Sequence, residues 1–269
     1  MTSIIKQDSA YFLSHNGLGD NITNIGSINF LLQYYNTIYF LCKNNYLENV
    51  NKLFKNKILS KNVILMPVNS NNENADCKII ITNAKENKLT DIFISGFCHT
   101  FYLNSRISHP DLLKYKQNDN NYTIKWSHIR SFYYDIGLDL SIYYNYFNID
   151  SSDESKQYFE YIKNYNIIFL HTKSSIKEIS LENIINKYIN LNDTIIICAN
   201  KNIYNKNDNK NNTKYELANK YVNILVADYI DIISNALEIH AIDSCFACII
   251  HPLNITKKLT AKVVTIYDR

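Results

Sequence analysis

The sequence predicts an α/β protein built on parallel sheets. Short apolar runs typical of strands alternate with longer segments typical of amphipathic helices, and this alternation occurs twice. Alternation of this kind places parallel strands side by side and helices on both faces of the sheet. The polar run 150–155 separates the two series and is interpreted as a linker.

In the first series, the segment 21–35 illustrates a predicted helix. Ile22, Ile25, Ile28 and Leu32 recur near one helical face, which favours an amphipathic helix. The other segments are assigned in the same way. The expected strands are residues 11–14, 37–42, 63–67, 77–82 and 91–95, and the expected helices are residues 21–35, 45–56 and 126–136.

The second series begins after the linker. Its expected strands are residues 167–171, 194–199, 224–226, 239–242 and 263–267, and its expected helices are residues 180–189, 215–222, 229–237 and 244–250. The stretch 200–214 is rich in Asn and Lys and is predicted to be a loop. Two Rossmann-like domains, 1–150 and 151–269, follow from this pattern. A ligand is expected at the carboxyl ends of the strands, in a cleft between the domains.

Composition narrows the class of protein. The net charge of +3 does not indicate an extended nucleic-acid surface. No apolar run approaches the roughly 20 residues of a membrane span, and the start of the chain does not resemble a signal peptide. We therefore expect a cytoplasmic protein whose 6 Cys are free thiols. Frequent Asn, Ile, Lys and Tyr indicate AT-rich coding, as in a large DNA virus, whose host cytoplasm is then the compartment, or in an AT-rich microbe.

The first candidate site is the turn after the first strand. The chain has 5 Gly, and Gly17 and Gly19 both lie here, followed by Asp20 and Asn21. A Gly-rich turn between a strand and a helix brings backbone N–H groups close to a ligand, and an Asp beside it can serve as a base. The dinucleotide fingerprint G-x-G-x-x-G is not met, because position 22 is Ile. The alternative is a tight turn in which Asp20 caps the helix.

The second candidate site follows the strand 167–171. Hydroxyl groups and two lysines at the end of a strand offer donors and positive charge for phosphates. The alternative is an ordinary polar loop whose Ser180 caps the next helix. The candidate binding residues are His171, Lys173, Ser174, Ser175 and Lys177.

The third candidate site is the start of the helix 244–250. Asp243 and Ser244 precede an apolar helix, whose N–H groups and positive dipole end favour an anion. His240 lies just before them and is a further candidate. The alternative is simple N-capping, which both Asp and Ser perform well.

A zinc site is a competing interpretation of the same region. Cys245, Cys248 and His251 are spaced three apart on one helical face, and His240 is near in sequence. The helix is otherwise apolar, and free Cys commonly packs as a small hydrophobic residue. We therefore expect no metal. Likewise, the tyrosines at 133–134 and 143–146 are expected to pack helices, with stacking on a sugar or base as the alternative.

In this order, the three segments resemble the GT-B glycosyltransferases of the heptosyltransferase kind, grouped as family 9. Those proteins have a Gly-x-Gly-Asp-like turn near the N-terminus, a polar Lys-containing loop after the first strand of the second domain, and a His-x-x-Asp-Ser/Thr segment that enters a late helix. The resemblance implies two Rossmann-like domains with parallel sheets facing a central cleft. The first domain takes the acceptor and the second takes the nucleotide sugar.

The resemblance also implies a reaction and its residues. A sugar passes with inversion from a nucleotide-diphosphate sugar to a glycan or other hydroxyl acceptor, without a metal or cofactor, and Asp20 acts as general base. Lys173 or Lys177, with Ser174 and Ser175, supplies positive charge and donors for the departing diphosphate. Ser244 and the N–H groups beyond it assist. His171 and His240 hold the phosphate, ribose or sugar.

Two other functions stay open from the sequence. One is a non-catalytic GT-B-like module that binds a nucleotide or a glycan. The other is a nucleotide-sugar epimerase on the same fold. The residues do not name the donor base, the sugar, the acceptor or the oligomeric state, because loop side chains rather than the fold decide them.

Overall fold

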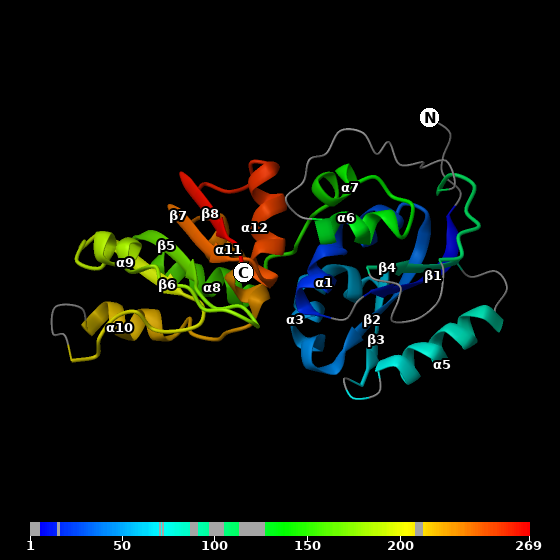
Figure 1. Ribbon diagram of the computed structural model, residues 1–269, viewed down its shortest axis with the longest axis horizontal. Coiled ribbons are helices and arrows are strands. Elements are labelled where there is room, and N and C mark those ends of the chain that lie inside the picture. Colours follow the sequence, from blue (N-terminus) through cyan, green and yellow to red (C-terminus); the bar gives the residue numbers. More distant parts are fainter. Residues whose placement is uncertain are drawn as a thin grey trace. The chain divides into compact units, whose positions relative to one another are not determined.

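The computed structural model describes residues 6–14, 17–69, 71, 73–86, 91–96, 105–112, 127–207 and 212–269. The chain divides into two compact units, Met1–Asp150 and Ser151–Arg269 (Figure 1). Each unit is built on one parallel sheet, so the expected α/β class with two parallel sheets is confirmed. Within the described residues, no helix combines the length and the apolar character that crossing a membrane requires.

Unit 1 contains a sheet of four parallel strands in the order β3-β2-β1-β4. Its described strands are β1 (Gln7–Ser14), β2 (Tyr35–Lys43), β3 (Val63–Val68) and β4 (Asp91–Ser95). Its described helices are α1 (Leu18–Thr23), α2 (Ile25–Leu31), η1 (Asn44–Tyr46), α3 (Leu47–Leu53), α4 (Lys55–Leu59), α5 (Glu73–Glu86), α6 (Ser127–Tyr134) and α7 (Ser141–Asn145). The central pair β1 and β2 is thus flanked by one strand on each side.

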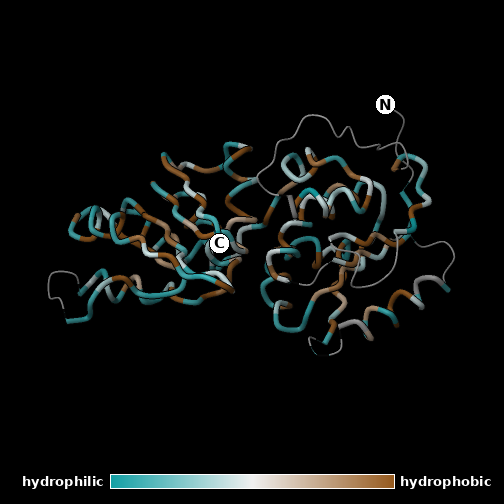
Figure 2. Tube along the Cα trace, viewed as in Figure 1, coloured by the Kyte–Doolittle hydropathy of each residue, from teal (hydrophilic) through white to brown (hydrophobic). Residues whose placement is uncertain are grey.

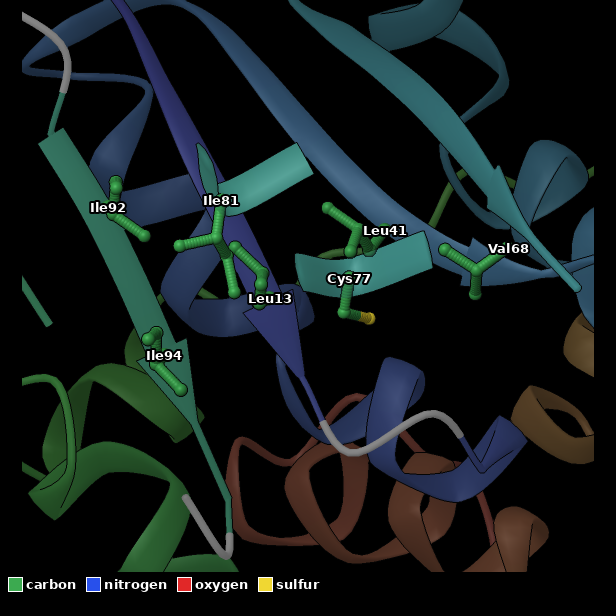
Figure 3. Packing of buried hydrophobic residues seen from close by; sticks show 7 residues of the cluster. All are labelled: Leu13, Leu41, Val68, Cys77, Ile81, Ile92 and Ile94. Atoms are coloured by element: carbon green, nitrogen blue, oxygen red, sulfur yellow. The ribbon is translucent and has the colours of Figure 1, made fainter. Parts of the chain in front are cut away.

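The predicted strand at 77–82 is wrong, because this segment belongs to helix α5. Cys77 and Ile81 lie one helical turn apart and pack on the sheet, whereas Ile79 is 60% exposed (Figure 3). The apolar run is too short to separate a strand from a helix by periodicity. Figure 2 shows the alternating hydropathy along α5. The cluster on this face comprises Leu13, Leu41, Val68, Cys77, Ile81, Ile92 and Ile94.

Aromatic side chains fill the opposite face of the same sheet. Strand residues alternate between faces, so Phe12, next to Leu13, points away from α5. Its ring lies 5.8 Å from that of Phe40 and 6.2 Å from that of Phe93. Phe12, Leu13 and Ser14 at the carboxyl end of β1 are buried, so this end is a fixed point for the turn that follows.

The tyrosines singled out in the sequence pack helices together. Tyr133 is buried and donates a hydrogen bond to the carbonyl of Thr23 at 2.9 Å, and its ring lies 5.7 Å from that of Tyr143. A Cβ at Gly26 would come within 2.8 Å of the Tyr133 hydroxyl oxygen. Gly26 therefore allows the close approach of α2 to α6 and α7.

The predicted helix 21–35 is two helices, α1 and α2, that meet at Asn24. Asn24 is fully buried. Its Nδ2 donates to Ser14 Oγ at 2.8 Å and to the Asp20 carbonyl at 2.9 Å, and its Oδ1 accepts from Ser95 Oγ at 2.7 Å. The Phe132 carbonyl oxygen lies 2.9 Å from Ser95 Oγ and shares the single proton of that hydroxyl with Asn24 Oδ1. This Asn24 network joins the carboxyl ends of β1 and β4 to the α1–α2 junction.

Unit 2 contains a second sheet of four parallel strands in the order β6-β5-β7-β8. Its described strands are β5 (Asn166–His171), β6 (Thr194–Cys198), β7 (Glu238–Ile242) and β8 (Val263–Tyr267). Its described helices are α8 (Asp153–Ile162), α9 (Glu182–Tyr188), α10 (Asn212–Asn219), η4 (Val226–Tyr229), α11 (Ile230–Ser234) and α12 (Cys245–Ile255). Figure 1 labels these strands and α-helices, with colours that run from green at α8 and β5 to red at β8.

Two further sequence assignments in unit 2 are corrected. The expected strand 224–226 gives way to the 3₁₀ helix η4, because three apolar residues offer too little pattern to exclude a tight helical turn. The expected loop 200–214 ends earlier, since α10 begins at Asn212. The remaining strands of this unit form where the apolar runs predict them.

Hydroxyl groups fix the start of unit 2. Ser152 is the N-cap of α8: its Oγ accepts from the Ser155 amide at 2.9 Å and donates to Asp228 Oδ1 at 2.8 Å. Ser155 Oγ in turn accepts from the Asp231 amide at 2.9 Å. The polar run 150–155, interpreted from the sequence as a linker, therefore includes the anchored first turn of α8.

Replacing Asn24 by Ala should destabilise unit 1. The change removes the hydrogen bonds that Asn24 makes with Ser14 and Ser95 in a buried site, and each lost hydrogen bond of this kind costs about 1–3 kcal/mol. We expect a lower urea midpoint of unfolding, measured through the fluorescence of the buried tyrosines. The exposed Asn51→Ala is the matched control. Equal midpoints for the two variants would contradict a stabilising role for the Asn24 network.

Candidate functional site in each unit

The turn after β1 is held by Asp20 itself. Gly17 is the N-cap of α1, and its N–H donates to Asp20 Oδ2 at 3.0 Å. The expectation that Asp20 is the N-cap is corrected: Asp20 lies three residues later and reaches back to the cap. A Cβ at Gly17 would lie 2.6 Å from Asp20 Oδ2, so a larger residue here would displace the carboxylate from its present position. His15 and Asn16, which precede the turn, lie outside the described residues.

The other predicted residues of this turn serve its own backbone. Asn21 is buried, and its Nδ2 donates to the Gly17 carbonyl at 3.0 Å. The Gly19 carbonyl accepts from the Thr23 hydroxyl at 2.9 Å. Asp20 is half-buried and lies at the carboxyl end of β1. Of Gly17, Gly19, Asp20 and Asn21, Asp20 alone has an ionisable side chain, and the other three shape the turn.

A tight hairpin follows β5 in unit 2. The Ser174 amide donates to the Lys177 carbonyl at 2.8 Å, and the Ile179 amide donates to the Thr172 carbonyl at 2.9 Å. Ser174 Oγ donates to the Lys177 carbonyl at 3.1 Å and accepts from the Lys177 amide at 3.1 Å. Lys173, Ser175 and Lys177 are exposed on this hairpin. Ser174 therefore builds the turn, and the two lysines provide its positive charge.

The hairpin is tied to the neighbouring strand β6. Asn200, just after β6, accepts from the Thr172 amide at 2.9 Å through Oδ1 and donates to Thr172 Oγ1 at 3.0 Å through Nδ2. Lys201 forms an exposed ion pair with Glu178 at 2.8 Å. Parallel strands end at one edge of the sheet, and these contacts lock two of the four ends together.

His171 and Ser244 meet at the same edge. His171 is the last residue of β5, and its Nδ1 lies 3.1 Å from Ser244 Oγ. Its ring packs against Phe246, with 4.6 Å between the ring centroids. His171 is 8% exposed, and burial lowers the pKa of its imidazole to about 4. At neutral pH the ring is uncharged.

Ser244 is the N-cap of α12, as the sequence suggests. Its Oγ accepts from the Phe246 amide at 3.3 Å. Asp243 does not cap the helix: its Oδ2 lies 3.3 Å from Arg269 Nε, and its amide donates to the Tyr267 carbonyl at 2.8 Å. Lys177 Nζ donates to the Asp268 carbonyl at 3.4 Å. The ends of β5, β7 and β8 therefore share one cluster of polar groups.

His240 lies elsewhere. Leu170 pairs with His240 and His171 pairs with Ala241, so the two imidazoles project from opposite faces of the sheet. His240 is buried; its Nε2 lies 3.2 Å from Glu238 Oε2 and its Nδ1 lies 3.2 Å from the Tyr267 hydroxyl. The structure thus gives both ring nitrogens protein partners and does not bring His240 to His171 and Ser244.

Glu238 is the centre of this second cluster. Burial raises the pKa of its carboxyl, but hydrogen bonds from Tyr188, His240 and Lys187 outweigh burial and bring the pKa below its ordinary value. Lys187 Nζ lies 3.2 Å from Glu238 Oε1, and the Tyr188 hydroxyl donates to the same oxygen. These contacts hold α9 against β7. They also give the buried side chains of Glu238 and His240 hydrogen-bond partners inside the unit.

The cysteines near the start of α12 behave as packing residues. Cys248 is buried, and burial raises the pKa of the Cys245 thiol to about 11. Both are free thiols. Across the described ranges, no group of three or more His, Cys, Asp or Glu side chains is arranged to hold a metal ion.

The sequence interpretation missed the residues that orient these sites. In unit 1 Asn24 lies among Ile22, Ile25 and Ile28 in the sequence. A polar residue of low helix propensity within an apolar helical segment was the available signal of its structural role. In unit 2 the contacts of Asn200 and Arg269 join segments far apart in the chain, and nothing in their local sequence indicates them.

Comparisons with known proteins agree with this architecture. The glycosyl transferase family 9 protein of Veillonella parvula is similar in structure with a TM-score of 0.57 and 8% identity, over 98% of this chain and 88% of that one. The E. coli ADP-heptose LPS heptosyltransferase II gives a TM-score of 0.50 and 9% identity, over 96% and 90%. No family model and no curated sequence matches. The chain therefore has the GT-B type of fold seen in family 9 glycosyltransferases.

The stability of unit 2 should fall as the pH drops from about 6.5 to 4.5. The unfolded His171 takes up a proton near the ordinary histidine pKa of 6.5, whereas the folded imidazole resists protonation down to about 4. Acid therefore favours unfolding, by about 2–3 kcal/mol over this range. The half-buried imidazole of His251, whose pKa burial also lowers, adds a slope of the same sign.

Comparison with His171→Gln isolates the contribution of His171. Urea midpoints measured across this pH range should fall more steeply for the natural chain than for the variant. Glu238, whose pKa is lowered in the folded state, is present in both proteins, so its contribution cancels in the comparison. Parallel profiles would contradict the buried, neutral state of the His171 ring.

Proposed function

We propose that the chain is a glycosyltransferase that moves a sugar from a nucleotide-diphosphate sugar to a hydroxyl acceptor, with inversion and without a metal. One observation carries the proposal. On the fold of family 9 glycosyltransferases, Asp20 lies at the carboxyl end of a central strand, and Lys173, Lys177 and Ser244 lie at the carboxyl ends of strands in the second unit. That edge is where open parallel sheets bind ligands.

In the proposed reaction, the acceptor oxygen attacks the anomeric carbon of the donor sugar. A new C–O bond forms as the bond from that carbon to the diphosphate breaks, and the bonding electron pair leaves with the diphosphate. The acceptor proton passes to the carboxylate of Asp20. Asp20 receives one hydrogen bond from Gly17, which holds the carboxylate in place, and a carboxylate has further acceptor positions for a hydroxyl.

The second unit would stabilise the departing diphosphate. Lys173 and Lys177 are exposed on a hairpin whose backbone is fixed by Ser174 and Thr172. α12 begins beside this hairpin and offers the positive end of its dipole. Negative charge that develops on the leaving group is stabilised by such fixed donors and cations.

A non-catalytic module that binds a nucleotide or glycan is the second candidate. The observation that favours it is the role of Asp20 within its own turn, where the carboxylate accepts the Gly17 N–H. A carboxylate used solely in this way would leave binding without turnover. Nucleotide binding and the Asp20 variants together separate these functions.

Thermal unfolding with nucleotides tests the donor side. UDP, GDP, ADP and CMP and their sugars are compared, ADP because the E. coli neighbour is named for ADP-heptose. Binding to the folded state alone raises the unfolding temperature, and a ligand at 100 times its Kd adds about 2.7 kcal/mol. We expect one base to stabilise the protein. The absence of any shift with millimolar nucleotide would contradict the proposal.

Asp20→Asn tests the base. Asparagine keeps an acceptor oxygen for the Gly17 N–H but lacks a basic carboxylate, so the turn should persist while transfer falls about 10²–10⁴-fold. The donor that gives the thermal shift is used, and nucleotide release is measured with and without acceptor. An altered sugar released without acceptor would instead indicate an epimerase.

Asp20→Ala is the comparison for the turn. It removes the base and also the hydrogen bond to Gly17, so it should lose stability as well as activity. The donor should still stabilise both variants, because Asp20 lies in unit 1. Full transfer activity in Asp20→Asn would show that the base assignment is wrong.

A further inference from the structure

His171 combines nearly complete burial with a ring nitrogen that no protein group satisfies. The side chain is 8% exposed, and its Nδ1 lies 3.1 Å from Ser244 Oγ. Its Nε2 has no hydrogen-bond partner anywhere in the described part of the chain. Nε2 is not among the enclosed side-chain atoms that lack a partner, so it is open at the surface of the unit and a ligand or water can reach it.

The partners of Ser244 decide where the ring proton lies. Ser244 Oγ already accepts from the Phe246 amide at 3.3 Å, which leaves its own proton for an acceptor. The side chains in contact with it are the His171 ring and the thiol of Cys245. An imidazole nitrogen is a much better acceptor than a thiol. The hydroxyl therefore donates to Nδ1, and the ring proton lies on Nε2.

The position of the ring proton decides whether the imidazole attracts or repels a phosphate oxygen. An imidazole protonated on Nε2 presents a hydrogen-bond donor to an anionic oxygen, whereas one protonated on Nδ1 presents a lone pair, which repels it. Burial against Phe246 keeps the ring neutral, with a pKa of about 4, so the choice lies between these two forms. The nearby start of α12, a helix of 11 residues, also attracts an anion.

We propose that Ser244 holds His171 in the Nε2-protonated form, so that the ring donates a hydrogen bond to a phosphate oxygen of the donor. The identity of the ligand rests on the proposed function, but the state of the ring does not. Ser244 thereby acts as a positioning residue through His171, in addition to capping α12. The pair gives the second unit a neutral donor beside the lysines of the hairpin.

The first arm of the test examines the free protein. Long-range ¹H–¹⁵N correlation spectra of the chain with ¹⁵N-labelled histidine report which ring nitrogen carries the proton, and His171→Gln identifies the signal. We expect Nε2–H in the natural chain and in Ser244→Thr, which keeps the hydroxyl. Ser244→Ala should shift the ring to a mixture of forms. A proton on Nδ1 in the natural chain overturns the proposal, even if Ser244→Ala does not fold.

Ser234→Ala is the matched control. Ser234 lies in the same unit, and its carbonyl, rather than its side chain, accepts hydrogen bonds from Thr260. Its removal should leave the His171 signals unchanged. A change equal to that in Ser244→Ala would mean that the spectra report general loosening of unit 2, and would overturn the specific role of Ser244.

The second arm adds inorganic pyrophosphate. We expect the Nε2–H signal to move on titration, and the affinity to fall roughly tenfold in Ser244→Ala, which corresponds to the loss of one hydrogen bond. Equal affinity in both proteins overturns the inference and leaves donor binding intact. Failure of pyrophosphate and every nucleotide to bind contradicts the proposed function, whereas the protonation of the ring is decided by the first arm alone.

Discussion

Parallel pairing is the constraint on which the arrangement of both units depends. In each sheet all strands run the same way, so their carboxyl ends lie along one edge and their connections must return through helices. Residues distant in the sequence, such as Asp243 and Lys177, are collected at one edge by this rule alone. The pairing does not fix the side chains there, and a second set of interactions performs that task.

That second set consists of buried hydrogen bonds between the ends of neighbouring strands. In unit 1 Asn24 links Ser14 at the end of β1 to Ser95 at the end of β4. In unit 2 Asn200 links the ends of β6 and β5 through Thr172. Each amide uses both its donor and its acceptor, and a buried network that is satisfied in this way is rigid. The turns that carry Asp20 and Lys173 are thereby held without any ligand.

The local sequence pattern was sufficient to predict most of the strands and helices. It was insufficient where contacts between distant residues decide the structure. The strands around Phe12 and Ile168 are predictable because their short apolar runs alternate regularly with helical segments. The helix at Cys77 was not, since its three successive isoleucines suit a strand equally well. Asp20 was recognised as a turn residue, but its reach back to Gly17 depends on the folded geometry of the turn. The separation of His240 from His171 follows from strand register, which the sequence does not show.

The two units achieve preorganisation by different chemistry, and the difference follows from charge. The proposed base, Asp20, is half-buried, and one of its carboxylate oxygens is held by the Gly17 N–H at the start of a short helix. In our proposal the second unit offers a proton to the diphosphate, and His171 does so while neutral because Ser244 occupies its other nitrogen. A cationic histidine in that buried position would destabilise the fold, whereas a neutral one adds a donor at little cost. Positive charge is left to Lys173 and Lys177, which lie on the surface where ionisation carries no burial penalty.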